Sequence, residues 1–135
     1  MKKFLVTSFT TLIIAIACSA FLQEYDLSKS IERGKEVYAN NCSSCHMDDG
    51  SATTDLYPPL AKSDYLNNPV DTLINIVLLG QTGEIEVNGQ KYNDEMLAQD
   101  YLTDDQVADV LNYVRNSWGN KMPAINPPQV KALRK

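Results

Sequence analysis

The stretch Cys42-Ser43-Ser44-Cys45-His46 carries the strongest chemical signal in this chain, because it contains the only histidine among 135 residues. Two thiols separated by two residues and followed directly by an imidazole form the attachment motif of a c-type haem. Each sulfur can bond covalently to one arm of the porphyrin, and His46 can then supply an axial ligand to the iron. Since there is no second histidine, a methionine is the first residue to consider for the opposite face of the iron.

Two other chemistries use a similar pair of cysteines. A thioredoxin-like redox pair needs a strand that leads into the motif, whereas residues with helical spacing precede it here. A structural zinc site usually takes four protein ligands, so Cys42, Cys45 and His46 would need a carboxylate to complete the set. The motif therefore predicts one covalently attached haem c, bound by Cys42 and Cys45, with His46 as an iron ligand.

The N-terminal residues predict export from the cytoplasm. Lys2 and Lys3 precede an apolar stretch over residues 4–17, which is long enough for a signal-peptide core and short for a membrane span. The run Ala15-Ile16-Ala17-Cys18-Ser19 then resembles a bacterial lipobox, in which the cysteine is lipidated and becomes the new N-terminus.

We therefore expect a signal peptide over residues 1–17 and a lipidated tether over residues 18–27. Cleavage near Ala20 without lipidation is the alternative, but it would leave Cys18 unexplained. Lipidation predicts a protein of the cell envelope that is anchored to the membrane and lies on its periplasmic side.

Cysteine count and charge limit what else the domain can do. Lipid on Cys18 and haem on Cys42 and Cys45 would leave no cysteine for a disulfide. Without residues 1–17 the chain has a net charge of −7, which disfavours nucleic acid as a partner and favours a basic protein surface. Because the haem would add a large apolar body to a small core, we expect the chain without haem to be poorly folded.

Apolar residues recur at helical spacing on both sides of the motif. This spacing predicts a first helix over about residues 28–40, running into the motif. A middle helix is predicted with Asn68 as its cap and Pro69 in its first turn. The last helix should open with the capping box Thr103-Asp104-Asp105-Gln106 and end at Gly119-Asn120.

A small β element and a proline-rich end complete the chain. Asn88-Gly89 between residues 84–87 and 90–92 is a strong hairpin signal. Residues 121–135 contain three prolines and a basic end, and we expect them to form a tail over the surface. The predicted architecture is one all-α domain over residues 28–120 with a single small hairpin.

Taken together, these residues resemble a class I cytochrome c, the single-haem type. The resemblance covers roughly residues 28–120, in the order N-terminal helix, haem motif, Pro58-Pro59-Leu60, methionine and C-terminal helix. Within the class, the chain is similar to small bacterial domains, here of lipoprotein type, that stand alone or are fused to copper nitrite reductases or terminal oxidases. This closer likeness rests on Val87-Asn88-Gly89, Tyr92-Asn93, Met96 and the run from Asn112 to Asn120.

The resemblance implies the cytochrome c fold, in which the N- and C-terminal helices cross beside the covalently attached haem. A small β-hairpin then precedes the loop of the axial methionine. Gly34 would be the close-contact point of the crossing, against the Val110 and Val114 side of the last helix.

The resemblance also implies a second layer of residues around the haem. The carbonyl of Pro58 would accept a hydrogen bond from the second ring nitrogen of His46, which orients the ring and raises its basicity as a ligand. Leu60 would pack on the haem. Pro58 and Leu60 are therefore expected to be cofactor-binding residues along with the two cysteines.

The family keeps its sixth iron ligand, a methionine, in the loop between hairpin and last helix, where Met96 lies. Met47 adjoins His46 and would lie on the wrong face of the haem. Met122 lies beyond the last helix, although it is followed by proline, as the family's ligand often is, whereas leucine follows Met96. Position favours Met96 as the metal ligand with His46, and core packing is the other use of either methionine.

These features predict an electron carrier and not an enzyme. Histidine–methionine ligation fills both axial positions and leaves no place for a substrate. We expect the protein to transfer single electrons between respiratory redox partners. The alternatives are an electron-transfer subunit of a larger membrane reductase or oxidase, and a five-coordinate haem sensor for small ligands, which requires that Met96 does not coordinate.

Acidic residues gather in sequence near the haem motif and the ligand loop. They predict an acidic rim that docks a basic redox partner, and the alternative is an ordinary solvated acidic surface. The residues concerned are Asp48, Asp49, Asp55, Asp94 and Glu95.

Overall fold

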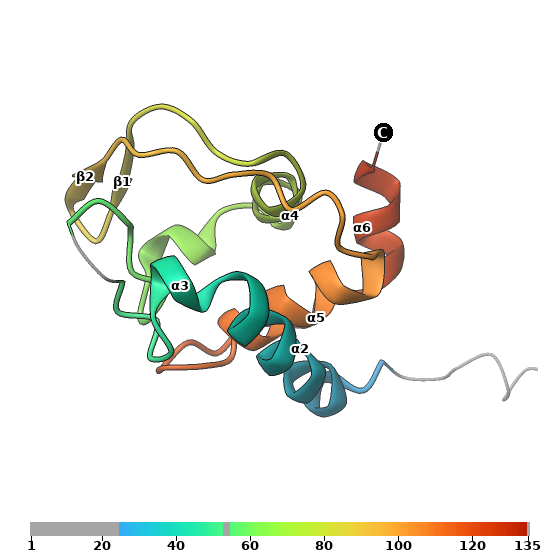
Figure 1. Cartoon of the computed structure of the whole chain (residues 1–135). Helices are drawn as coiled ribbons and strands as arrows, with labels where there is room; N and C mark the ends of the chain where they lie inside the picture. The colour runs from blue at the N-terminus through green and yellow to red at the C-terminus, as the bar shows by residue number, and fades with distance from the viewer. Residues whose placement is uncertain (1–24, 53–54, 135) are drawn as a thin grey trace, which may run out of the picture.

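The computed structural model describes residues 25–52 and 55–134; the predicted signal peptide and Cys18 lie outside this part. Helices dominate it, together with one 3₁₀ turn and one two-stranded antiparallel sheet (Figure 1). The elements are α2 (Leu27–Asn41), α3 (Ser43–His46), η1 (Asp64–Asn67), α4 (Val70–Leu79), β1 (Ile85–Val87), β2 (Gln90–Tyr92), α5 (Asp104–Val114) and α6 (Pro127–Leu133). No helix in these two ranges has the length and apolar character needed to cross a bilayer.

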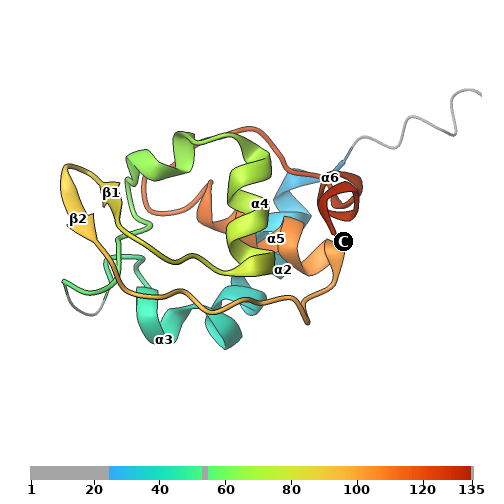
Figure 2. The same cartoon turned by 90° about the horizontal axis from the view of Figure 1, so that it is seen from above.

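Helices α2 and α5 cross in direct contact, as both views of the fold show (Figures 1 and 2). Gly34 of α2 lies at the crossing, where an added Cβ would collide with the backbone carbonyl of Asp109 and lie 2.9 Å from Cβ of Tyr113. The predicted close contact at glycine is confirmed, because no other residue lets the two backbones approach so closely. The atoms nearest to this Cβ belong to Asp109 and Tyr113, each one position before the predicted Val110 and Val114.

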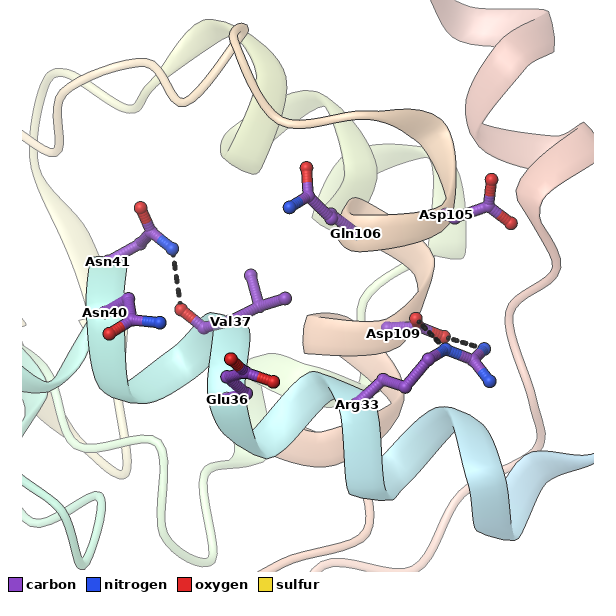
Figure 3. A pocket seen from close by; sticks show the side chains of 8 residues that line it. All are labelled: Arg33, Glu36, Val37, Asn40, Asn41, Asp105, Gln106 and Asp109. Atoms are coloured by element: carbon purple, nitrogen blue, oxygen red, sulfur yellow. Dashed lines mark hydrogen bonds and ion pairs between the residues drawn. The ribbon is translucent and has the colours of Figure 1, made fainter.

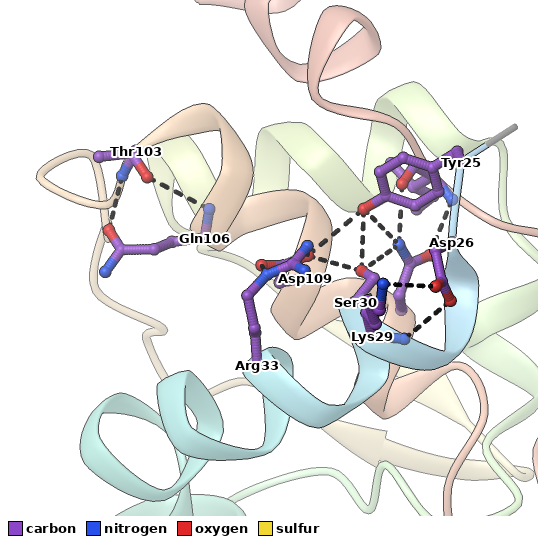
Figure 4. A network of polar contacts seen from close by, with 10 residues as sticks. Tyr25, Asp26, Lys29, Ser30, Arg33, Thr103, Gln106 and Asp109 are labelled. Atoms are coloured by element: carbon purple, nitrogen blue, oxygen red, sulfur yellow. Dashed lines mark hydrogen bonds and ion pairs between the residues drawn. The ribbon is translucent and has the colours of Figure 1, made fainter. Parts of the chain in front are cut away.

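The same crossing contains a network of polar side chains around the buried Asp109 (Figure 4). Asp109 is 3 % exposed and accepts two hydrogen bonds from the guanidinium of Arg33, at 2.6 and 2.7 Å, and one from the Ser30 hydroxyl at 2.6 Å. The Tyr25 hydroxyl donates to the same Ser30 oxygen at 2.8 Å. This network links the start of α2 to the middle of α5, so the crossing has polar as well as apolar contacts.

Helix α5 begins where the sequence predicts and ends earlier. The capping box is present, because the Thr103 hydroxyl accepts from the backbone N–H of Gln106 and the Gln106 side chain accepts from that of Thr103. The helix ends at Val114 instead of near Gly119, and Trp118 has a φ of 51°. The tryptophan ring then packs beside Tyr38 and Tyr113, with centroid distances of 5.1 and 5.2 Å. Trp118 thus joins this aromatic cluster from outside the helix, which helical spacing alone does not predict.

The segment after α5 is not the surface tail that we expected. Ile125 and Val130 are both fully buried, and α6 packs against α4 and α5 (Figure 2). Asn112 of α5 anchors the segment that precedes α6. Its side chain donates to the Ile125 carbonyl at 2.8 Å and accepts from the Ile125 N–H at 2.7 Å. The prolines at the start of α6 occupy first-turn positions, where a missing N–H costs nothing.

The predicted hairpin is confirmed, with Asn88 and Gly89 both at positive φ in its turn. It is fastened to η1 by two bonds between Asn88 and Asp64, at 2.8 and 3.0 Å. Helix α4 also forms as predicted, except that Pro69 and not Asn68 occupies the cap position.

Candidate haem site

The attachment motif forms one helical turn directly after α2. Cys42 ends α2, and its carbonyl oxygen accepts hydrogen bonds from the backbone N–H groups of Cys45 and His46, at 3.2 and 3.0 Å. Residues three and four positions apart in a helical turn lie on the same face. The turn therefore presents both thiols and the imidazole on one side of the chain.

The two cysteines of the motif are in the thiol form and are not joined as a disulfide, although they are close in sequence. Cys42 is half-buried and packs against the apolar core. Its burial, with a smaller contribution from Cys45, raises the pKa of the Cys42 thiol to about 11. A neutral sulfur in apolar surroundings suits a thioether bond to an apolar ring, and it disfavours the low-pKa thiolate that redox-active pairs use.

His46 is oriented by the loop that contains Pro58. Its Nδ1 lies 3.1 Å from the Pro58 carbonyl oxygen, which can only accept, so Nδ1 carries the hydrogen and Nε2 keeps a lone pair for a metal. Burial lowers the pKa of His46, and the hydrogen bond to Pro58 opposes this shift. The imidazole is therefore neutral at physiological pH, which is the form that binds iron.

Gly50 holds the loop that brings Pro58 to His46. Its carbonyl accepts from the backbone N–H groups of Leu60 and Ala61, at 2.8 and 3.0 Å, and so closes the loop. The φ of Gly50 is +70°, and an added Cβ would lie 2.6 Å from the ring of Trp118. Neither Gly50 nor Trp118 was predicted as part of the site, and a glycine four residues after the histidine was the only local signal.

Leu60 is half-buried and packs against the apolar core. Its carbonyl oxygen accepts a hydrogen bond from the Asn120 side chain at 2.8 Å, and the same amide also donates to the Val114 carbonyl. This contact links the Pro58 segment to the end of α5. Packing of Leu60 on the haem stays a prediction.

Met96 lies in the extended segment between the hairpin and α5. It exchanges two backbone hydrogen bonds with Gln81, both 2.9 Å long, and is half-buried. Met122 packs against the apolar core instead, and Met47 is 42 % exposed. Core packing therefore accounts for Met122, and coordination of the iron by Met96 stays a prediction.

The donor set fits a haem and no other metal group that we considered. Among residues 25–52 and 55–134, no three histidine, cysteine, aspartate or glutamate side chains come together to hold a metal ion, as a zinc site would require. A helix leads into the motif, whereas a thioredoxin-like pair needs a strand. Two cysteine thiols and a neutral imidazole with its second nitrogen already bonded are what a covalently attached haem needs.

This fold and this site define a single-haem, c-type electron-transfer domain. Residues 31–118 match the cytochrome c family, and the chain belongs to that family. The predicted fold and the predicted cofactor, a covalent haem c, are thereby confirmed, with Cys42 and Cys45 as the attachment pair. The protein is an electron carrier and is not itself catalytic.

Its relatives are of two kinds. Cytochrome c-552 of Thermus thermophilus is 35 % identical over 124 residues, which are 85 % of this chain and 83 % of that protein. The cytochrome c subunit of the quinone alcohol dehydrogenase of Gluconobacter oxydans is 31 % identical over 75 % of this chain. The cytochrome c subunit of the gluconate 2-dehydrogenase of Pantoea cypripedii is 36 % identical over 87 % of it. The matched regions are 22 % and 29 % of those two subunits, so this chain corresponds to a small part of each.

Proposed function

We propose that this cytochrome carries single electrons between respiratory redox proteins of the cell envelope, with its iron held between His46 and Met96. The haem supplies an iron that alternates between the ferrous and ferric states. The observation that carries the proposal is the 3.1 Å contact between His46 Nδ1 and the Pro58 carbonyl, which fixes the ring and directs Nε2 toward a ligand position. A sulfur from Met96 would complete the coordination and leave no open site for a substrate.

The carrier and sensor functions differ in what the reduced protein binds. A six-coordinate carrier should show a reversible one-electron titration and no carbon monoxide binding to the ferrous protein at neutral pH. A five-coordinate sensor should bind carbon monoxide readily. Tight carbon monoxide binding by the wild-type protein would therefore contradict the proposal.

An uneven charge distribution supports docking of a basic partner at the haem side. The described residues between 44 and 96 include nine acidic and two basic side chains, whereas the other described residues include seven of each. The entire net charge of −7 in the described chain thus lies in the part that follows the attachment motif. An oppositely charged partner would be attracted to this part and oriented before contact.

Salt dependence tests this docking surface. The rate constant for electron transfer to a basic acceptor should fall steeply as ionic strength rises through the physiological range. Asp48, Asp49, Asp94 and Glu95 can be replaced by their amides to remove the charges nearest to the motif and the Met96 segment. The fourfold variant should be slower at low salt and clearly less sensitive to salt, and an unchanged salt slope would contradict the acidic rim.

Attachment to the membrane through a lipid on Cys18 is part of the proposal. It is supported by the lipobox-like run before Cys18 and by the use of the other two cysteines for haem. Mass spectrometry of the native protein tests it directly. A diacylglyceryl mass on an N-terminal Cys18 is expected, and a free N-terminus near Phe21 would contradict it.

A permanent subunit of a larger dehydrogenase complex is the second candidate function. It is favoured by one observation, which is the similarity to cytochrome c subunits of alcohol and gluconate dehydrogenases. Size-exclusion chromatography of a mild detergent extract distinguishes the two functions. A free carrier elutes near the mass of one chain in its detergent micelle, whereas a subunit elutes together with its partners.

A further inference from the structure

We propose that Tyr101 is a positioning residue that latches the segment bearing Met96 onto the residue before the first haem cysteine. The Tyr101 hydroxyl lies 2.9 Å from the side-chain oxygen of Asn41, which is 60 positions away, and shares its single hydrogen between this oxygen and that of Gln99. The inference rests on the proposed function, because it gives the latch the role of keeping Met96 at the iron.

The chain between Met96 and α5 is held by separate hydrogen bonds and not by regular secondary structure. At its start, Met96 and Gln81 exchange their two backbone bonds. Three residues later, the Gln99 N–H donates to the Val77 carbonyl of α4 at 2.8 Å. Both contacts fasten the segment on the side of α4. The side that faces α2 is fastened by Tyr101.

Arg134 holds the backbone on both sides of Tyr101. Its Nη1 donates to the Asp100 carbonyl at 2.9 Å and its Nη2 to the Leu102 carbonyl at 2.6 Å. Its Nε also donates to the Asp104 carboxylate at 2.8 Å. Because the backbone around Tyr101 is already ordered, the bond across to α2 has to order only the tyrosine side chain, which belongs to a residue that is 65 % exposed.

Asn41 is oriented to accept this bond. Its Nδ2 donates to the Val37 carbonyl at 2.7 Å, so the amide oxygen is directed away from the helix, as Figure 3 shows at the edge of the pocket between α2 and α5. Asn41 is the last residue of α2 and directly precedes Cys42. The Gln99 side-chain oxygen lies 2.6 Å from the same hydroxyl and is a second acceptor for its single hydrogen.

The latch thus joins the two parts of the chain that would place ligands on opposite faces of the iron. The motif beyond Asn41 provides His46, and the segment before Tyr101 provides Met96. Movement of this segment away from α2 must break the bond between Tyr101 and Asn41. The bond therefore favours the arrangement in which the Met96 segment stays against α2. Its loss favours forms in which an external ligand takes the place of Met96.

A double-mutant cycle on the haem-loaded protein tests the latch. The measured quantity is the affinity of the ferric protein for imidazole, which competes with the methionine sulfur and abolishes the far-red absorption band of a methionine–iron bond. The variants are Tyr101→Phe, Asn41→Ala and the two together. Tyr65→Phe is the matched control, because its hydroxyl makes no hydrogen bond to the described residues.

Each single substitution should raise the imidazole affinity about threefold to tenfold, which is the range expected for one hydrogen bond. The double variant should show no more than the larger single effect, since both changes remove the same bond. Tyr65→Phe should leave the affinity unchanged.

Two other outcomes overturn the inference in distinguishable ways. If the wild-type protein shows the far-red band but the two effects add, or Tyr101→Phe has no effect, the latch is wrong and the proposed ligation stands. If the wild-type ferric protein lacks the band altogether, Met96 is not a ligand, and both the latch and the proposed function fail.

Discussion

The α2–α5 crossing and the part of the chain that follows the haem motif are stabilised in different ways. At the crossing, two long helices meet backbone to backbone at Gly34, with the Asp109 network beside the contact. Beyond the motif, separate hydrogen bonds hold the loops, such as the one from His46 to Pro58 and the two between Met96 and Gln81. We therefore expect the haem-side loops to depend on the cofactor more strongly than the crossing does.

Charge follows the same division. The crossing and the C-terminal helix balance their acidic and basic residues, and Arg33, Asp109, Asp104 and Arg134 pair within them. The haem side keeps its negative charge largely unpaired, with Lys91–Glu84 as the ion pair found among its described residues. This difference in charge agrees with the proposal that a basic partner docks on the haem side.

The largest effect should come from removing the haem. We expect the double variant Cys42→Ala, Cys45→Ala to lose electron transfer entirely and to lose amide-exchange protection first in residues 47–96, because that part lacks its central apolar body. Hydrogen exchange followed by mass spectrometry measures this. If residues 47–96 and the α2–α5 crossing show equal amide-exchange protection, with or without haem, the proposed difference between these two parts is wrong.

Gly34→Ala should be the most damaging single change at the crossing. The added methyl group would collide with the Asp109 backbone, which cannot move without separating the helices. A loss of about 3 kcal/mol or more in the free energy of unfolding is expected from such overpacking. Thermal or denaturant unfolding of the haem-loaded protein measures it, with Lys35→Ala on an exposed position of α2 as the control.

Asp109→Ala should weaken the crossing less. It removes the acceptor of the bonds from Arg33 and Ser30, but the Arg33 side chain is 54 % exposed and can be hydrated after the change. A loss of about 2 kcal/mol is expected, below the cost of stranding a fully buried charge. Asp105→Ala, at an exposed position of α5, is the control. It should change the free energy of unfolding by no more than a few tenths of the loss expected for Asp109→Ala.

Gly50→Ala should have the smallest effect on stability and a specific effect at the site. The positive φ and the contact with the Trp118 ring cost about 1 to 2 kcal/mol, part of which the ring can relieve by shifting. Because Gly50 closes the loop of Pro58, the His46 ring should lose part of its orientation. A changed reduction potential measures this effect, and an unchanged potential in a destabilised variant would show that the loop does not position the ring.

Local signals in the sequence predicted the parts that local chemistry determines. The haem motif, the Asn88-Gly89 turn and the capping box at Thr103 each act within a few residues, and each forms as predicted. Gly34 was identified through the family resemblance, yet its nearest contacts are Asp109 and Tyr113 and not the predicted Val110 and Val114. The periodicity of α5 marked its apolar side and did not show that Asp109 would be buried beside it.

The parts that were missed depend on contacts between distant residues. The Pro127-Pro128 pair suggested a surface tail, but the Gln129 side chain accepts from the Asn126 N–H at 2.8 Å, and Val130 is buried where α6 packs against α4 and α5. Tyr101 and Asn41 are polar residues with no local pattern, and only the fold brings them together. The spacing of Asn126 and Gln129 is a local signal for α6 that the prediction of a tail did not use.

Coordination of the iron by Met96 can be tested without any partner protein, through the far-red absorption of the ferric, haem-loaded cytochrome. We predict a methionine–iron band in the wild-type protein, its loss in Met96→Ala, and its retention in Met122→Ala, whose side chain packs against the core. A band that survives in Met96→Ala and disappears in Met122→Ala would contradict this ligation, as would a wild-type protein that has no such band.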